Sequence, residues 1–339
     1  MNILFAKIGA IGDVVMALHA VVNWRKNNNH RLIWICGSNV AQLVDCSGLA
    51  DEIVTVNENR LFSSELLASA KELCCLWKKL AALSIDEVVI AHSDLRYRLL
   101  TMPFYLKRHR SFALRRRQRP LPITGRYYVA EHLRLLAGMD GNSLSELDFL
   151  RFLPGDREAD IVSIKGVELS NYVMLFPGGS NNALRNDAHR RWPLEHYVQL
   201  SKELRAHGYQ VVLGGAKSDE WVLDAFTGCN DVINCIGFFD LLQTVGLISK
   251  AVCVVTHDSG PMHLVTLTDT YLIALFGPTS PNSFIFSGRN NTKIMYRGNV
   301  IHCVPCYDGK YYANCKNNIC LLSISSEEVF SAFMKMMER

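Results

Sequence analysis

Short apolar runs alternate with longer segments of helical periodicity along the first 160 residues of the chain. The apolar runs are rich in β-branched and aromatic side chains, which favour buried strands. We predict strands at residues 3–5, 32–36, 52–56 and 87–91, with helices between them. The first of these helices covers the apolar segment 14–22.

The same alternation begins again in the second half. Strands are predicted at residues 172–176, 210–213, 232–234, 252–256 and 271–276, with helices near 194–207 and 241–247. Strands that alternate with helices predict parallel sheets joined by right-handed crossovers. We therefore expect an α/β protein with two Rossmann-like, doubly wound domains.

The join between the two halves is expected between residues 153 and 170, where Pro154-Gly155-Asp156 and polar residues suit a linker. We predict an N-terminal domain at 1–160 and a second domain at 168–322. A C-terminal helix at 323–339 is expected to pack back on the N-terminal domain. Ligands of such folds bind beyond the carboxyl ends of the strands, so two facing domains would form a cleft.

Composition places the chain among globular proteins, with 339 residues of which 49% are hydrophobic and 20% charged. No apolar run reaches the roughly 18 residues that a membrane span requires. Lys7 and Asp13 interrupt the N-terminal apolar segment, which argues against a signal peptide. We expect a cytoplasmic location and reduced thiols for the 11 cysteines.

Positive charge is concentrated between residues 96 and 126, which we call the basic segment. It has no Asp or Glu and carries +10, so the remainder of a chain of net charge +4 carries −6. The ten cations are Arg96, Arg98, Lys107, Arg108, Arg110, Arg115, Arg116, Arg117, Arg119 and Arg126. Such a block favours an acidic partner: a phosphorylated glycolipid, an anionic membrane face or a nucleic acid. A mobile basic loop is the alternative.

A polar turn, Asp258-Ser259-Gly260, follows an apolar β-branched run and precedes a predicted helix. Unpaired N–H groups and the helix dipole favour an anion at such a position, and Asp258 adds a carboxylate for sugar hydroxyls. Helix capping alone would also explain Asp or Ser there.

Two further polar turns follow predicted strands. Gly12-Asp13 comes after the first strand, in a G-x-x-G-D spacing that lacks the G-x-G-x-x-G of dinucleotide binders. Capping of the helix that follows would explain Asp13 equally well. The segment 177–182, with Gly178 and Gly179, precedes Arg190. Glycine-rich turns offer N–H donors to phosphate, and a guanidinium can hold two phosphate oxygens.

Four cysteines lie within 18 residues in the pattern C-x2-C-x8-C-x4-C: Cys303, Cys306, Cys315 and Cys320. Four thiolates suit a tetrahedral zinc or an iron centre, which would be structural because no coordination position stays open. A disulfide-capable pair or unliganded buried thiols are the alternatives.

These segments together resemble glycosyltransferase family 9, the heptosyltransferases of lipopolysaccharide assembly. The resemblance spans residues 3 to about 330 and rests on motifs that occur in order. They are Gly12-Asp13, Pro177-Gly178-Gly179, Arg190-Arg191-Trp192-Pro193, Gly214-Gly215-Ala216, the segments 258–263 and 276–281, and the cysteine-rich end.

The resemblance implies a GT-B fold and inverting transfer of a sugar, usually from ADP-heptose, with no cofactor needed for catalysis. Asp13 would be the base and Arg190, where the family usually has Lys, would stabilise the departing diphosphate. Arg has a fixed fork geometry, so this departure could change the rate or the donor preference. Donor binding is assigned to Gly179, Ser180, Asn181, Arg190, Glu220, Phe239, Asp258, Ser259, Gly260 and His263.

The resemblance also implies an acidic glycolipid acceptor, bound by the N-terminal domain. Acceptor binding is assigned to Gly12, Arg96, Arg98, Arg115, Arg116 and Arg117. The basic segment would draw the enzyme to anionic lipid, so we expect a peripheral contact at the inner face of the inner membrane.

Other readings of the sequence stay open. The acceptor could be a protein hydroxyl, since some relatives with cysteine-rich ends modify secreted adhesins. Because Arg190 stands where the family usually has Lys, the protein could also be a non-catalytic family member that binds a nucleotide sugar without transferring it. A nucleic-acid binder would use the same arginines, but aromatic residues are sparse among them.

Overall fold

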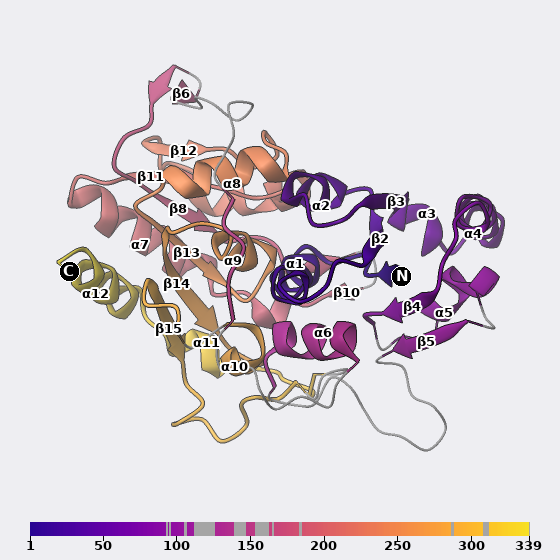
Figure 1. Ribbon diagram of the computed structural model, residues 1–339. Coiled ribbons are helices and arrows are strands. Elements are labelled where there is room, and N and C mark those ends of the chain that lie inside the picture. Colours follow the sequence, from indigo (N-terminus) through magenta and orange to yellow (C-terminus); the bar gives the residue numbers. More distant parts are fainter. Residues whose placement is uncertain are drawn as a thin grey trace. The chain divides into compact units, whose positions relative to one another are not determined.

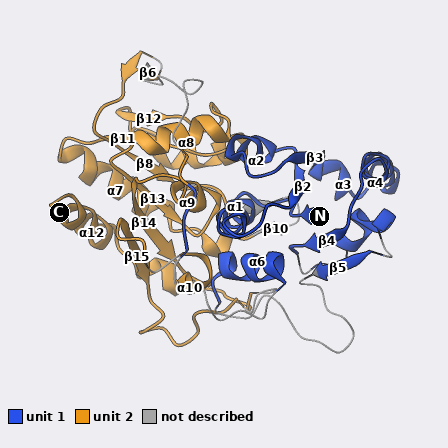
Figure 2. Ribbon diagram, in the orientation of Figure 1, with its two compact units in different colours: residues 1–150 blue, residues 151–339 orange. Residues whose placement is uncertain are grey.

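The computed structural model divides the chain into two compact units, residues 1–150 and 151–339 (Figure 2). The structure describes residues 1–92, 94, 96–104, 107–111, 126–138, 147–152, 163–164, 166–182, 185–285, 288–307 and 312–338. Each unit is an α/β fold with a parallel sheet, as the alternating pattern predicts.

The first unit contains a parallel sheet of order β3-β2-β1-β4-β5 (Figure 1). Its strands are β1 (Asn2–Ala6), β2 (Arg31–Gly37), β3 (Glu52–Val56), β4 (Glu87–Ile90) and β5 (Arg108–Ser111). Its helices are α1 (Ile11–Arg25), α2 (Ala41–Ser47), α3 (Glu58–Leu61), α4 (Leu66–Ala81), α5 (Tyr97–Leu100), the 3-10 turn η1 (Met102–Phe104) and α6 (Tyr128–Ala137).

Burial explains why these segments form the first sheet. The central strands β1 and β4 are almost wholly buried, so their apolar runs do not alternate with polar residues. Helix α1 is buried on most of its surface and packs beside α6. Strand β1 therefore delivers the start of α1 to the carboxyl edge of the sheet.

The second unit has a six-stranded parallel sheet of order β12-β11-β8-β13-β14-β15. The sheet strands are β8 (Tyr172–Phe176), β11 (Gln210–Leu213), β12 (Val232–Asn234), β13 (Cys253–His257), β14 (Tyr271–Phe276) and β15 (Thr292–Tyr296). Two small pairs join β6 (Ser163–Ile164) with β7 (Val167–Glu168), and β9 (Asn181–Asn182) with β10 (Arg185–Asn186). The sheet order is that of a doubly wound nucleotide-binding fold, which places a ligand site near the carboxyl ends of β8 and β13.

Helices follow most of these strands. They are η3 (Ala188–Arg190), α7 (Leu194–Ala206), η4 (Lys217–Phe226), α8 (Leu241–Lys250), α9 (Gly260–Val265), α10 (Pro281–Phe284), α11 (Ile319–Leu322) and α12 (Ser326–Met337). Helix α12 packs on α7 and β14 of its own unit through Val329 and Phe333. The three-part division expected from the sequence stays a prediction.

Every predicted strand is confirmed to within one residue at each end, but two described strands of the main sheets and the short pairs β6–β7 and β9–β10 were missed. Strands β5 and β15 lie at the edges of their sheets. Arg108 and Arg110 in β5, and Lys293 in β15, break the apolar runs from which strands are predicted. Among the helices of the described ranges, none is long and apolar enough to cross a bilayer.

Phe333 is fully buried in the core of the second unit, where α12 covers the sheet. We expect Phe333→Ala to lower the free energy of unfolding by about 3–5 kcal/mol, because the vacated volume is not refilled. Urea unfolding followed by tryptophan fluorescence measures the change. Lys335 is exposed on the opposite side of α12, so Lys335→Ala is the control and should change stability little. Equal effects of the two variants would contradict this packing.

Candidate functional sites at two sheet edges

Asp13 lies in the first turn of α1, at the carboxyl edge of the first sheet. Lys7 follows β1 directly, and its Nζ lies 2.9 Å from Asp13 Oδ2. The Lys7 side chain is 5% exposed, whereas that of Asp13 is 34% exposed. A buried ammonium therefore holds one face of a carboxylate that stays open to solvent on another.

Lys7 also sets the charge state of Asp13. Burial alone would raise the pKa of the carboxyl, but the charge and hydrogen bond of Lys7 outweigh it and lower the pKa below its ordinary value. Asp13 is thus ionised through the neutral range and can accept a proton from a bound group.

Two histidines complete the surroundings of this pair. His92 follows β4 and stacks on Tyr97, with ring centroids 4.0 Å apart. Burial, followed by the charge of Lys7, lowers the pKa of His92 to about 4 and that of His132, on α6, to about 3. Both rings are therefore neutral at pH 7, and Lys7 is the cation that balances Asp13.

In the second unit, the turn after β8 has a backbone that few residues adopt. Gly179 has a φ of 84° and Ser180 one of 57°. Asp219 holds this turn: its carboxylate accepts hydrogen bonds from Gly179 N and Ala216 N, each at 2.9 Å. A Cβ added at Gly178 would lie 2.5 Å from Asp219 Cγ, so glycine is needed for this close approach.

Arg190 and Asp258 form the central ion pair of the second site. Asp258 follows β13 and is 1% exposed, and its Oδ1 lies 2.9 Å from Arg190 Nη2. Thr279, which follows β14, donates a hydrogen bond to Asp258 Oδ2 at 2.6 Å. Burial alone would lower the pKa of Arg190, but Asp258 raises it above its ordinary value, so the guanidinium stays charged.

A buried polar network lies beneath the same turn. His257 Nδ1 is 3.2 Å from the Tyr197 hydroxyl, which donates to Phe176 O at 3.3 Å. Burial and the charge of Arg190 lower the pKa of His257 to about 3, so this ring adds no competing positive charge. Arg191 Nε donates a hydrogen bond to Gly179 O at 2.9 Å and so helps to fix the turn.

The structure brings several of the predicted donor residues together. The Ser180 hydroxyl donates to Asp258 O at 3.4 Å, and Ser259 and Gly260 form the start of α9. His263 is buried on α9, with its ring centroid 6.3 Å from that of Phe284.

The other predicted residues have the following positions in their own units. Glu220 is exposed on η4, and Phe239 is half-buried before α8. Asn181 begins the short strand β9, of which only the backbone is described. Gly12 is buried beside Asp13 in the first unit.

In the fold, carboxylates from other parts of the chain neutralise some of the positive charge of the basic segment. Arg96 pairs with Asp94 at 2.6 Å, and Arg126 pairs with Glu131 at 2.7 Å. Arg110 pairs with Glu87 at 2.6 Å, and Arg108 with the same carboxylate at 3.3 Å. Four of the ten cations therefore have carboxylate partners from outside the segment. Arg98 is exposed on α5, whereas Arg115, Arg116 and Arg117 lie outside the described residues.

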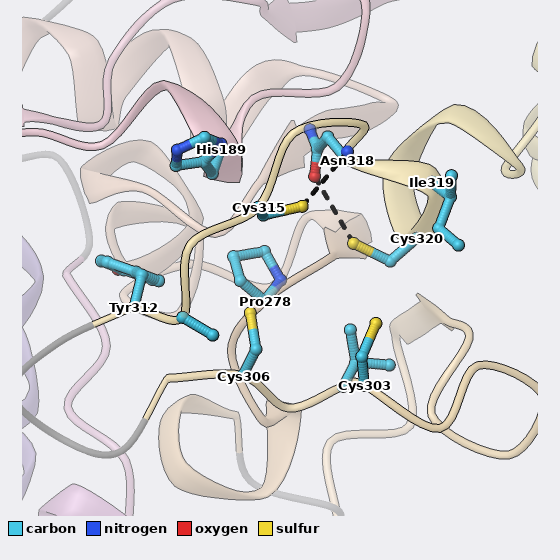
Figure 3. A pocket seen from close by; sticks show the side chains of 11 residues that line it. His189, Pro278, Cys303, Cys306, Tyr312, Cys315, Asn318, Ile319 and Cys320 are labelled. Carbon is cyan, nitrogen blue, oxygen red and sulfur yellow. Dashed lines mark hydrogen bonds between the residues drawn. The ribbon is translucent and has the colours of Figure 1, made fainter.

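The four C-terminal cysteines line one cavity with His189, Pro278 and Tyr312 (Figure 3). Asn318 lies between two of them: its N–H donates to Cys315 Sγ at 3.3 Å, and the Cys320 thiol donates to Asn318 Oδ1 at 3.4 Å. Burial, with the neighbouring cysteines, raises the pKa of Cys320 to about 11. Within the described ranges, no group of three or more His, Cys, Asp or Glu is arranged to hold a metal ion.

Sequence reasoning missed three residues that organise these sites. Lys7 was used only as a charge that excludes a signal peptide, although a lysine directly after a buried strand indicates a buried partner. Thr279 lies in a Gly-Pro-Thr-Ser-Pro turn after β14, which neighbours β13. After Gly214-Gly215-Ala216, Glu220 was assigned to the donor from the sequence, whereas the neighbouring Asp219 holds the backbone at Gly179 and Ala216.

Comparison with known proteins gives a family match for part of the chain. Residues 153–311 match glycosyltransferase family 9 (heptosyltransferase). The lipopolysaccharide heptosyltransferase 2 of Salmonella typhimurium is 41% identical over 99 residues, which are 27% of this chain and 28% of that protein. The chain therefore matches less than a third of the length of this curated relative.

Solved structures share the fold across the whole chain. The glycosyl transferase family 9 structure from Veillonella parvula has a TM-score of 0.76 at 18% identity, covering 100% of this chain and 97% of that one. The E. coli heptosyltransferase WaaC with ADP has a TM-score of 0.69 at 18% identity, covering 99% and 100%.

The iron-containing dodecameric heptosyltransferase TibC, in complex with ADP-D-beta-D-heptose, has a TM-score of 0.64 at 12% identity, covering 99% of this chain and 76% of that one. These likenesses show the two-domain GT-B fold. Residues 153–311 of this chain are therefore similar to glycosyltransferase family 9, and the whole chain shares the fold of solved members of that family.

Proposed function

We propose that the protein is an inverting glycosyltransferase that moves heptose from ADP-heptose to the core of lipopolysaccharide. The family match and the name of the Salmonella relative support heptosyl transfer, and the ADP and ADP-heptose complexes of the structural neighbours support the donor. The observation that carries the proposal is the Arg190–Asp258 ion pair, which holds a permanent cation at the edge where such folds bind nucleotides.

Arg190 is proposed to stabilise the leaving diphosphate. Its guanidinium is kept charged and oriented by Asp258, so it need not reorganise when negative charge develops on the departing oxygen. This arrangement gives Asp258 a positioning role, which refines the expectation that it contacts sugar hydroxyls. Gly179, Ser180 and Gly260 would offer polar groups to the phosphates from the same edge.

Asp13 is proposed to act as the base. The acceptor oxygen forms a bond to the anomeric carbon while the bond from that carbon to the diphosphate oxygen breaks. The hydroxyl proton passes to Asp13, and the bonding electron pair leaves with the diphosphate, beside Arg190. Lys7 would hold Asp13 ionised for this step.

The other predicted site residues are proposed to bind the acceptor or the donor. Arg98 and the arginines at 115–117 would meet the acidic groups of a core glycolipid and anionic lipid at the membrane surface. Arg96, already paired with Asp94, would contribute less. Glu220 and Phe239 would contact the nucleoside, and His263 would brace the turn before α9.

A structural zinc or iron remains a proposal for the four cysteines, supported by their spacing and by the structural neighbour TibC, an iron-containing heptosyltransferase. As placed, their side chains do not form a metal centre, and no step of the reaction depends on one. Elemental analysis of protein purified without added metal tests the proposal; absence of zinc and iron would contradict it.

Asp13→Asn removes the base without changing the shape of the side chain. We expect kcat for ADP release to fall by about 10²–10⁴-fold, because proton transfer from the acceptor is lost. The affinity for ADP, measured by calorimetry, should not change, since the proposed nucleotide site lies in the second unit. Unchanged kcat would remove Asp13 from the mechanism.

Arg190→Ala should weaken ADP binding and slow transfer together. It also leaves Asp258 buried without its partner, which costs about 3–5 kcal/mol of stability. Arg190→Lys keeps the charge and serves as the control: we expect partial recovery of affinity and rate, with near wild-type thermal stability. ADP affinity and kcat that stay the same in the folded alanine variant would contradict the role of Arg190.

Lys7→Met should shift the pH dependence of kcat. Asp13 must be ionised to act, and Lys7 lowers its pKa, so losing Lys7 raises that pKa and moves the acidic limb of the profile to higher pH. Lys7→Arg keeps the positive charge and should leave the limb near its wild-type position. An acidic limb that does not move in the methionine variant would show that Asp13 is not the titrating base.

A further inference from the structure

Helix α4 exposes leucines at its start. Leu66 is 84% exposed and Leu67 is 87% exposed, although more than half of the described leucines are buried. Leu99 and Met102, in α5 and η1, are 51% and 52% exposed. Large apolar side chains grouped on one surface mark an interaction site more often than a single exposed leucine does.

The same face of α4 is positively charged. Leu67, Lys71, Cys74 and Lys78 follow one another at spacings of three or four residues, so they lie on one side of the helix, and all four are exposed. Lys79 is exposed beside them. The acid within this helix, Glu72, is half-buried and accepts a hydrogen bond from Asn57 N at 2.8 Å.

The fold holds this face outward. On the opposite side of α4, Leu76 and Leu80 are buried in the core of the first unit. The Trp77 indole N–H donates to Leu99 O at 2.7 Å, which ties α5 to the flank of α4. The leucines therefore cannot turn inward without breaking this packing, and α5 and η1 contact the same helix α4 (Figure 1).

We propose that Leu66, Leu67, Lys71, Lys78 and Lys79, which we call the α4 surface, dock on an anionic lipid bilayer. Leucines enter the boundary between headgroups and acyl chains, while lysines pair with lipid phosphates. A second copy of the chain fits this surface poorly, because a two-fold contact would place lysines against lysines. The inference rests on the membrane contact proposed above but not on the transfer reaction.

Vesicle binding by the full chain tests the α4 surface. Flotation with phosphatidylglycerol vesicles is compared for the wild type, the double variant Leu66→Ser/Leu67→Ser and the triple variant Lys71→Gln/Lys78→Gln/Lys79→Gln. We expect wild-type binding to phosphatidylglycerol but not to phosphatidylcholine. The double variant should bind the vesicles roughly tenfold more weakly than the wild type. In the triple variant, each lysine removed should lower the affinity for the vesicles roughly fivefold.

Leu322→Ser changes a leucine of the second unit that is 52% exposed, and this variant should bind as the wild type does. Thermal shift with ADP checks that each variant is folded. If both α4 variants float like the wild type, the α4 surface is wrong although membrane contact stands. If the wild type itself does not float, both are wrong. Light scattering measures the oligomeric state of each variant. If the substitutions change that state instead of vesicle binding, the face is a protein interface and the inference fails.

Discussion

The ion pair between Arg190 and Asp258 is the interaction on which the second unit's site depends. A buried carboxylate is stable only when it is paired, and Asp258 is paired twice, with Arg190 and with Thr279. As a consequence, Arg190 is kept charged and is held at the strand ends. A lysine at this position could supply the charge but not the planar fork.

The first unit uses the same principle at its own sheet edge. Lys7 is buried behind Asp13, so the carboxylate is ionised and fixed while part of it stays exposed. In each unit, one buried charge fixes a partner of opposite sign, and parallel strands set the position of the pair. The neutral histidines His92, His132 and His257 fill the space nearby without adding charge at pH 7.

Much of this could be predicted from the sequence, because buried parallel strands are continuous apolar runs with polar turns at their ends. Asp13, Arg190 and Asp258 were found through those turns. Pairings across the fold could not be predicted: the link from Thr279 to Asp258 joins two neighbouring strand ends that are 21 residues apart in the chain. The same holds for Arg110, which the sequence grouped with the basic segment but which pairs with Glu87.

Analysis of the reaction product is the most direct test of the proposed transfer of heptose to a lipopolysaccharide core. Purified protein is incubated with ADP-heptose and lipopolysaccharide that lacks core heptose, and the product is analysed by mass spectrometry and NMR. We predict a mass increase of one heptosyl residue and an anomeric configuration inverted relative to the donor. Unchanged lipopolysaccharide, or a product that retains the donor configuration, would contradict it.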